Sequence, residues 1–311
     1  MKILLLGANG QLGQTFLKEG SLAVFGDVTT ATRDGQVSGQ MPGETVDLQF
    51  PEEIRSALDR IQPDVIINAA AYTAVDRAEQ EEELATRING LAVGAIGAWA
   101  AAHNALVLHY STDYVFDGQS ECPYAVDAAT APLGAYGRSK LVGEQALAAS
   151  GAHHLIFRTA WVYGSHGHNF MRTMLRLGAD RDELRVVDDQ YGAPTSTLLI
   201  VRGTLAALKT WIEAPTADRP KLEGIHHLVA SGTTTWHRFA TAIFDDAFQH
   251  RLIARKPVVT AIGTVDFPTP AKRPMYSVLE NSRFEKLFAF TLPDWQQGLH
   301  EVMGELSTHM S

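Results

Sequence analysis

The chain has 311 residues and a net charge of −9 at neutral pH, with 45% hydrophobic and 20% charged residues, as expected of a globular protein. No basic block indicates general nucleic-acid binding, and no apolar run approaches the roughly 20 residues of a membrane span. Because Cys122 is the only cysteine, no intrachain disulfide can form, and we expect a cytoplasmic protein with neither nucleic acid nor membrane as a partner.

The first predicted element is a buried strand over residues 1–6, whose apolar run is too short for the core of a signal peptide. Gly7, Gly10 and Gly13 follow at a spacing of three, and residues 14–18 begin a helix. A glycine-rich turn between strand and helix lets backbone N–H groups approach a pyrophosphate. The same glycines would also close a strand on a helix without any ligand. Their place directly after a strand favours the dinucleotide interpretation.

A second strand is predicted over residues 28–33 and ends in Arg33. An acidic residue at such a strand end binds the ribose 2′-hydroxyl of NAD(H), whereas an arginine pairs with the 2′-phosphate of NADP(H). Arg33 therefore predicts NADPH, but Asp34 follows it directly and keeps NADH open as the cofactor. The alternative is that Arg33 is an ordinary solvated surface residue.

Strands and helices then alternate up to about residue 150, which predicts a doubly wound parallel sheet. Asn89 lies among apolar neighbours in one of these helices and is expected to form hydrogen bonds in the core. Small residues at 69–71 either leave room for a ligand or pack tightly against a helix. The predicted elements are helices at 51–60 and 82–103 and strands at 63–71 and 105–109.

Residues 110–140 contain the side chains that could take part in a chemical reaction. Thr112 and Asp113 stand at the end of a predicted buried strand, and Tyr136 and Lys140 are four apart in a predicted helix, so they share one helix face. An ammonium beside a phenol stabilises the phenolate, which makes the phenol a proton donor. A hydroxyl at the strand end could hold a carbonyl oxygen beside that phenol. This set of groups predicts the reduction of a ketone.

Past a strand at 155–164 the regular alternation ends. Prolines in residues 267–274 exclude a helix or a central strand there and predict a stiff loop. The other predicted elements are helices at 169–177, 196–211, 234–250 and 295–306, strands at 184–187 and 225–229, and a loop at 188–195.

Blocks along essentially the whole chain resemble the dTDP-4-dehydrorhamnose reductases, within the extended short-chain dehydrogenase/reductases. They are GANGQLG at 7–13, RIQPDVIINAAAYTAVDRAE at 60–79, HYSTDYVFDG at 109–118, PLGAYGRSKLVGE at 132–144, HLIFRTAWVYG at 154–164, DQYGAPT at 189–195, HHLVASGTTTWH at 226–237 and PTPAKRPMYSVL at 268–279. The resemblance implies NAD(P)H-dependent reduction of the C4 ketone of dTDP-4-dehydro-6-deoxy-L-mannose to dTDP-L-rhamnose. This is the last step of dTDP-rhamnose biosynthesis, and the sequence leaves open whether the rhamnose enters lipopolysaccharide, another cell-wall polymer or a secondary metabolite.

The resemblance also assigns roles. Thr112 would hold the C4 oxygen, Tyr136 would protonate it, and Lys140 would lower the Tyr136 pKa and hold the nicotinamide ribose. Asp113 would touch the sugar or cap the turn, and Trp161 would contact the sugar or base or else fill the core. The predicted cofactor-binding residues are Gly7, Gly10, Gln11, Leu12, Gly13, Arg33, Asp47, Leu48, Ala71, Tyr72, Thr73, Tyr110, Tyr136 and Lys140.

The implied architecture is an α/β fold with a Rossmann-type doubly wound parallel sheet and a smaller mixed α/β substrate domain. We expect a dinucleotide-binding domain over residues 1–160, to which some later segments return, and a mainly sugar-nucleotide-binding domain over residues 161–311. The alternative functions are another nucleotide-sugar reductase or epimerase on this fold, or a non-catalytic NADP-binding regulatory subunit. The intact catalytic set counts against the regulatory role.

One departure from the family concerns metal. Some members bind Mg²⁺ at a dimer interface through acidic side chains, but two of those positions are Thr15 and Thr197 here, and only Glu305 still matches. A hydroxyl is a poor substitute for a carboxylate around a hard cation. We therefore expect no metal site of that kind, while a monomer and a homodimer both remain open.

Overall fold

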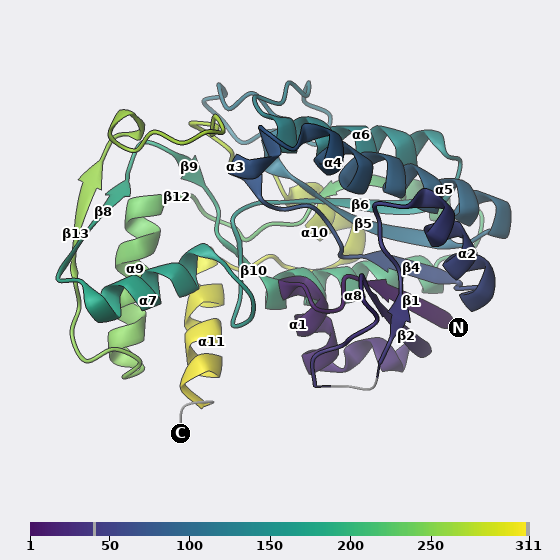
Figure 1. The fold of residues 1–311 in the computed structure, drawn as a ribbon, viewed down its shortest axis with the longest axis horizontal. Helices are drawn as coiled ribbons and strands as arrows, with labels where there is room; N and C mark the ends of the chain where they lie inside the picture. Colours follow the sequence, from purple (N-terminus) through teal and green to yellow (C-terminus); the bar gives the residue numbers. More distant parts are fainter. Residues whose placement is uncertain (40–41, 309–311) are drawn as a thin grey trace.

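The computed structural model describes residues 1–39 and 42–308, and its centre is a seven-stranded parallel sheet (Figure 1). The strand order is β11-β6-β5-β4-β1-β2-β3, and every neighbouring pair is parallel. The strands are β1 (Lys2–Leu6), β2 (Asp27–Thr32), β3 (Glu44–Thr45), β4 (Val65–Asn68), β5 (Leu106–Thr112), β6 (His153–Thr159) and β11 (Gly224–His227).

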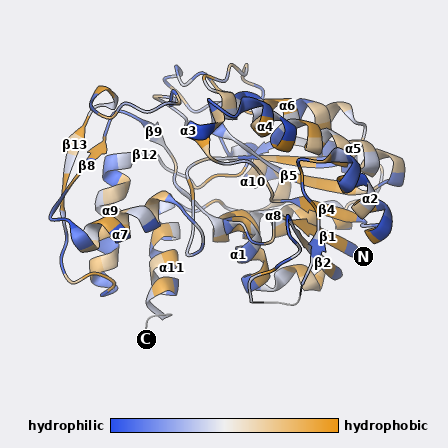
Figure 2. Cartoon of the chain, viewed as in Figure 1, coloured by the Kyte–Doolittle hydropathy of each residue, from blue (hydrophilic) through white to orange (hydrophobic). Residues whose placement is uncertain are grey.

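Helices cover both faces of the sheet because its strands are apolar on both sides. Ile3 and Leu5 of β1 belong to one core cluster, while Leu4 and Leu6 belong to a second. Figure 2 shows the central strands as hydrophobic, between helices whose outer surfaces carry hydrophilic residues. The covering helices are α1 (Gln11–Glu19) and α8 (Thr197–Glu213) on the first face, and α2 (Pro51–Ile61), α5 (Ala92–His103) and α6 (Ala135–Ala149) on the second.

The order of the strands reverses between β1 and β4. From β1 the chain adds β2 and β3 on one side, and from β4 it adds β5, β6 and β11 on the other. In open α/β sheets, ligands bind outside the carboxyl ends of the strands at such a reversal. The predicted α/β fold with a doubly wound parallel sheet is confirmed, and the expected binding edge is defined.

The second half of the chain contributes both to this sheet and to a smaller region. Strand β11 pairs with β6 at the sheet edge, and α8 contacts α1. The smaller region holds pairs of short strands and the helices packed around them; its division from the first region at residue 160 stays a prediction. Its elements are β7 (Val162–Tyr163), β8 (Glu183–Val187), β9 (Tyr191–Gly192), β10 (Thr195–Ser196), β12 (Thr234–Thr235), β13 (Val258–Ile262), α7 (Phe170–Asp180), α9 (Trp236–Gln249) and α11 (Trp295–Thr308). Helix α10 (Ser282–Phe288) packs instead against β11 of the large sheet and against α8.

The helix predicted over residues 82–103 is interrupted. It consists of α4 (Glu82–Thr86), a π-helical turn over Arg87–Leu91, and α5. At this turn the chain passes very close to α6, because a Cβ on Gly143 would lie only 2.1 Å from the Asn89 carbonyl oxygen. Single π-turns inside α-helices are often found near functional sites.

Two other predicted elements need correction, and two elements were missed. The strand expected at 155–164 is broken after Thr159, where Trp161 adopts φ +48°, a conformation that a strand cannot contain. The loop expected at 188–195 contains β9 and the start of β10, and β13 and α10 were not predicted. No helix within residues 1–39 and 42–308 combines the length and apolarity that crossing a bilayer requires.

Candidate active site

The predicted site segments follow the carboxyl ends of four neighbouring strands. The glycine turn follows β1, residues 69–73 follow β4, Thr112 ends β5, and Trp161 comes two residues after β6. Since β6, β5, β4 and β1 are adjacent and parallel, these segments lie along one edge of the sheet. The fold therefore brings the predicted residues to the edge where a ligand is expected.

The three glycines of the turn after β1 meet different structural requirements. Gly7 has φ +79°, and a Cβ there would lie 2.6 Å from the backbone nitrogen of Ala70. A Cβ on Gly13 would lie 2.2 Å from the Gly7 carbonyl oxygen, so both residues are required for the close contact of strand and helix. Gly10 is exposed, and its nearest obstacle is 3.2 Å away. Gly10 is thus the exposed glycine of the turn, where a pyrophosphate can approach the backbone.

The side chains of Gln11 and Leu12 face protein. Gln11 Oε1 accepts a hydrogen bond from Asn169 Nδ2 at 2.9 Å, and Leu12 packs against the core. Asn169 Nδ2 also donates to the Gly164 carbonyl oxygen at 2.9 Å, which ties the segment after β7 to the glycine turn. A cofactor contact at residues 11 and 12 would therefore be made by their backbone N–H groups at the start of α1. Asn169 was not identified from the sequence, because only the fold brings it to the turn.

Arg33 lies just past the end of β2, is exposed, and forms no ion pair or hydrogen bond with the described residues. The carboxylate of Asp34 is already used by the loop, since its Oδ1 accepts from the Thr32 hydroxyl and the Gln36 backbone, both at 3.1 Å. These hydrogen bonds lower the pKa of Asp34. Thus the arginine is available to a ligand, whereas one oxygen of the carboxylate is not.

Asp47 and Leu48 precede α2. Asp47 Oδ1 accepts from the Gln49 backbone N–H at 3.0 Å and shapes the turn that begins the helix, while Leu48 is buried in the core. Neither side chain has a free polar group directed at an identified ligand position. Their predicted contact with the cofactor stays a prediction.

The loop after β4 is fixed by Asn89. The backbone N–H of Tyr72 donates to Asn89 Oδ1 at 2.9 Å, and the Tyr72 carbonyl accepts from Asn89 Nδ2 at 3.0 Å. The same amide group reaches Ser139 of α6 at 2.9 Å. Asn89 therefore forms core hydrogen bonds, as expected, and joins the predicted cofactor loop to the helix that carries Tyr136. Ala71 and Thr73 on either side of Tyr72 are exposed.

Tyr136 and Thr112 meet at the end of β5. Burial and, to a smaller extent, the charge of Asp113 raise the pKa of Tyr136 to about 12, against an opposing effect of the Thr112 hydroxyl. Lys140 is not among the groups that shift this pKa. The predicted lowering of the Tyr136 pKa by Lys140 stays a prediction, and in this structure the ammonium lies against another residue.

That residue is His109, which was not identified from the sequence. Lys140 Nζ lies 3.3 Å from His109 Nε2, and His109 Nδ1 lies 3.2 Å from Asn68 Nδ2. All three side chains are buried. Burial lowers the pKa of Lys140 to about 8, and burial together with the charge of Lys140 holds the His109 pKa well below its usual range. The available signal was a histidine inside an otherwise apolar strand.

Asp113 has an unused acceptor. Its Oδ1 accepts from the Thr112 hydroxyl at 3.0 Å, but its buried Oδ2 has no hydrogen-bond partner among the described residues. Burial raises the pKa of Asp113 to about 6, while the hydroxyls of Ser277 and Thr112 lower it. The turn itself is capped by Thr112, which accepts from the Tyr114 backbone at 3.2 Å. The free oxygen thus favours a ligand contact over a purely capping role.

Tyr110 points into the core on the other side of β5. Its hydroxyl hydrogen-bonds to Thr204 of α8 at 3.0 Å, and its ring packs near Phe157. Adjacent residues of a strand face opposite sides, so Tyr110 is separated from the side chains of His109 and Lys140. A cofactor contact at Tyr110 would have to be made by its backbone.

Trp161 is half-buried and strained. It has φ +48°, and its ring stacks on Trp236 of α9 with centroids 3.5 Å apart and planes 6° apart. Gly192 lies against the indole, because a Cβ there would be 2.4 Å from Trp161 Cε2. An unfavourable backbone conformation held by such packing is common at ligand-binding positions. Trp161 is thus neither ordinary core nor free in solution.

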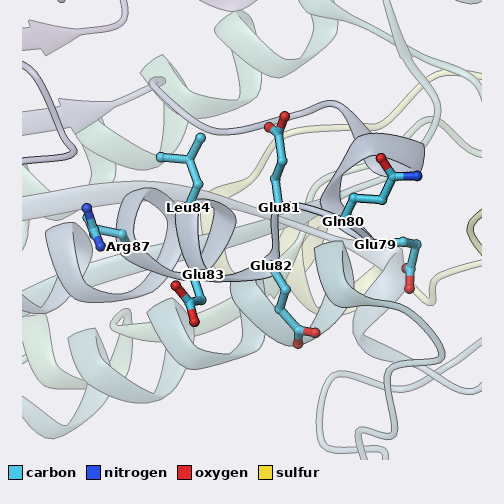
Figure 3. Close-up of a pocket in the computed structure, with 7 residues that line it drawn as sticks. All are labelled: Glu79, Gln80, Glu81, Glu82, Glu83, Leu84 and Arg87. Atoms are coloured by element: carbon cyan, nitrogen blue, oxygen red, sulfur yellow. The ribbon is translucent and has the colours of Figure 1, made fainter.

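A shallow pocket lies apart from these predicted site residues, and two of the residues that line it bind α6. Glu79 Oε1 accepts from the Ala135 backbone N–H at 2.9 Å at the start of α6, and Glu82 forms an ion pair with Arg138 at 2.7 Å. The carboxylates of the glutamates that line this pocket would repel an anionic dinucleotide or sugar nucleotide. The pocket, next to α4 and α3 (Val75–Ala78), is shown in Figure 3 and is lined by Glu79, Gln80, Glu81, Glu82, Glu83, Leu84 and Arg87.

Comparisons with known proteins show which family and which solved structures the chain is similar to. The family described as the RmlD substrate binding domain matches residues 1–308. A dTDP-4-dehydrorhamnose reductase of Escherichia coli (strain K12) is 43% identical over 312 residues, which cover 99% of each chain. The crystal structure of a dTDP-4-dehydrorhamnose reductase from Clostridium acetobutylicum has a TM-score of 0.85 at 35% identity, covering 98% of this chain and 99% of that one. One from Bacillus anthracis, in complex with NADP, has a TM-score of 0.84 at 32% identity, with the same coverage.

Proposed function

The chain belongs to the dTDP-4-dehydrorhamnose reductase family, and on that premise we propose that its reaction takes place between Thr112, Tyr136 and Lys140. The activity is the NAD(P)H-dependent reduction of the C4 ketone of dTDP-4-dehydrorhamnose, which yields dTDP-L-rhamnose. The observation that carries the assignment of residues is the packing of α6, which holds Tyr136 and the buried Lys140, against the end of β5 and the turn after it, where Thr112 lies.

In this proposal the C4 oxygen lies beside the hydroxyls of Thr112 and Tyr136. The bound dinucleotide supplies the hydride to C4. Tyr136 gives its proton to the C4 oxygen, so the ketone gains one hydride and one proton and becomes an alcohol. The Thr112 hydroxyl, whose one proton is donated to Asp113 Oδ1 in this structure, would turn that proton towards the same oxygen and so position it. The free Oδ2 of Asp113 accepts a hydrogen bond from a sugar hydroxyl.

Thr112 has a matched control one residue earlier. Thr112→Val removes only a hydroxyl and should lower kcat by about 10²-fold, the lower end of what one positioned group contributes. The buried hydroxyl of Ser111 has no hydrogen-bond partner among the described residues, so Ser111→Ala should leave kcat within about threefold of wild type. NADPH consumption in the presence of the 4-keto sugar nucleotide measures both. If the two variants had equal kcat, the Thr112 hydroxyl would have no role in the reaction.

We also propose NADPH as the preferred cofactor. The support is the unpaired, exposed Arg33 beside a carboxylate that the loop already uses. The exposed Gly10 and the start of α1 fit the pyrophosphate of the same cofactor. The other predicted contacts, at Gln11, Leu12 and residues 71–73, would be made mainly by the backbone.

We propose that the enzyme needs no bridging Mg²⁺, whether it is a monomer or a homodimer. The hydroxyls of Thr15 and Thr197 are buried and hydrogen-bond to each other at 2.9 Å, between α1 and α8. Glu305 forms an ion pair with Lys18. Thr15 and Thr197 carry no anionic oxygen, and one carboxylate oxygen of Glu305 is already paired with Lys18. Treatment with EDTA should leave turnover and the sedimentation coefficient unchanged; a change in either on chelation would contradict this proposal.

A cytoplasmic location is part of the same proposal. The single cysteine, Cys122, is exposed and free, as is usual in a reducing compartment. Fractionation of cells with an antibody against the chain would test this, and recovery in a periplasmic or membrane fraction would refute it.

A further inference from the structure

We propose that Asp246, His250 and His300 form a binding site for one divalent transition-metal ion of the zinc class. Asp246 lies in the last turn of α9, and His250 is the residue that caps that helix, four positions later. His300 lies on α11, which packs beside α9 (Figure 1). The site is separate from Thr15, Thr197 and Glu305, and it does not depend on the proposed function.

The spacing of the donor atoms fits one ion. His300 Nδ1 lies 3.0 Å from Asp246 Oδ1 and 3.4 Å from His250 Nε2, and all three donor atoms lie within 4.8 Å of one another. Tetrahedral Zn²⁺ with bonds of about 2.0–2.2 Å needs donor atoms about 3.3–3.6 Å apart. The 3.4 Å separation already matches, the 3.0 Å separation is slightly shorter than this range, and small side-chain rotations would bring all three into it.

Hydrogen bonding within the cluster is incomplete without an ion. His300 Nδ1 faces both a carboxylate oxygen and an imidazole nitrogen, but it carries at most one proton, which can be directed fully at only one of them. The other oxygen of Asp246, Oδ2, is buried and has no hydrogen-bond partner among the described residues. A cation at the centre would be bound by all three groups at once.

The donor set selects the kind of ion. Two imidazoles and one carboxylate suit Zn²⁺, Co²⁺ or Ni²⁺, whereas Mg²⁺ prefers oxygen ligands. Asp246 also influences Tyr163, whose pKa is raised by burial and by the charges of Asp246 and Glu301. His300 is 66% exposed at its side chain, so an ion and a fourth, water ligand can enter from solvent.

The consequence of binding would be structural. An ion would join the end of α9 to α11, whose later residue Glu305 is paired with Lys18 of α1. None of the three proposed ligands belongs to the predicted catalytic or cofactor sets. Bound metal should therefore stabilise the chain while leaving the reductase reaction unchanged.

The test uses the full-length protein, stripped of metal with a chelator and titrated with ZnCl₂ by calorimetry. We expect one ion per chain at micromolar affinity, a rise of several degrees in Tm, and no comparable effect of MgCl₂. Co²⁺ should give the visible d–d absorption of a tetrahedral site. His300→Ala and Asp246→Asn should each weaken Zn²⁺ binding at least tenfold, whereas His103→Ala, at an exposed histidine on α5, should not.

Turnover of each variant at wild-type rate serves as the check on folding. If the folded His300→Ala and Asp246→Asn proteins bind Zn²⁺ as tightly as wild type, the ion binds elsewhere and the proposal is wrong. Absence of saturable Zn²⁺ binding by the wild-type chain would overturn it as well.

Discussion

The centre around Tyr136 and the surroundings of Trp161 are built in different ways, although both lie at the same edge of the sheet. In the centre, the polar side chains are buried and come from neighbouring regular elements, β4, β5 and α6, as in the row Asn68, His109 and Lys140. Trp161 is half-buried, has φ +48°, and is held by a ring stack and a glycine from short, distant segments.

We infer from this difference that the two regions have different functions, one in the chemical step and the other in substrate recognition. Buried, hydrogen-bonded groups on rigid elements suit chemistry, because their positions and pKa values are fixed before the substrate arrives. An aromatic side chain at the joint of several loops suits recognition of the nucleotide sugar. We therefore expect changes in the centre to reduce kcat and changes around Trp161 to raise KM.

Lys140→Met should have the largest effect, a loss of about 10²–10⁴ in kcat, because it removes the buried ammonium. Burial lowers the pKa of Lys140 to about 8, so the wild-type amine is charged below that pH and neutral above it. If the charge is required, kcat falls as the pH rises through about 8. A kcat that does not fall with rising pH across that range would contradict this role. Lys209→Met, at an exposed lysine of α8, is the control.

Trp161→Ala should raise KM for the sugar nucleotide about tenfold or more, as loss of an aromatic contact of 1–2 kcal/mol would, and change kcat by less than about threefold. Steady-state kinetics at saturating NADPH measure both. Trp161→Phe should recover part of the affinity, since it restores a ring. A large loss of kcat at unchanged KM would contradict the assignment of Trp161 to substrate recognition.

Arg33→Ala tests whether Arg33 binds the 2′-phosphate of the cofactor. Loss of a charge-assisted bond to the 2′-phosphate should raise KM for NADPH about tenfold and leave KM for NADH unchanged. Arg55→Ala, at an exposed arginine of α2, should affect neither. Equal losses for both cofactors would show that Arg33 is a surface residue without a cofactor contact.

Asp113→Asn should have the smallest effect, on stability. The folded pKa of Asp113 is raised from 3.8 to about 6, so the buried carboxylate costs stability above pH 6, and this cost disappears as the pH falls from 6 towards 3.8. The variant should be more stable than wild type by about 1–3 kcal/mol at pH 8 and equally stable near pH 4. Urea unfolding at both pH values tests this; a less stable variant at pH 8 would contradict it.

The parts of the site that depend on local sequence could be predicted. The glycine turn and the spacing of Tyr136 and Lys140 are properties of one strand–helix junction and one helix turn. The fold of the first 150 residues followed from its alternating strands and helices.

The missed residues depend on contacts between distant segments. His109 and Asn68 meet Lys140 only because β4 and β5 are paired under α6, and Trp236 reaches Trp161 across 75 positions of the chain. No periodicity predicts the left-handed backbone of Trp161 or the π-helical turn at Asn89, since packing imposes both. These contacts explain why an imidazole lies directly beside Lys140, which the sequence did not indicate.

The most direct measurement is a single-turnover reaction of Tyr136→Phe with dTDP-4-dehydrorhamnose and bound NADPH. This variant loses only the phenol hydroxyl, so NADPH should bind as tightly as in wild type while the fall in NADPH absorbance slows by about 10²–10⁴-fold. Tyr114→Phe, at a neighbouring buried tyrosine whose ring lies 5.7 Å from that of Tyr136, is the control. A Tyr136→Phe enzyme that oxidises NADPH at close to the wild-type rate would contradict the assignment of Tyr136 as the proton donor.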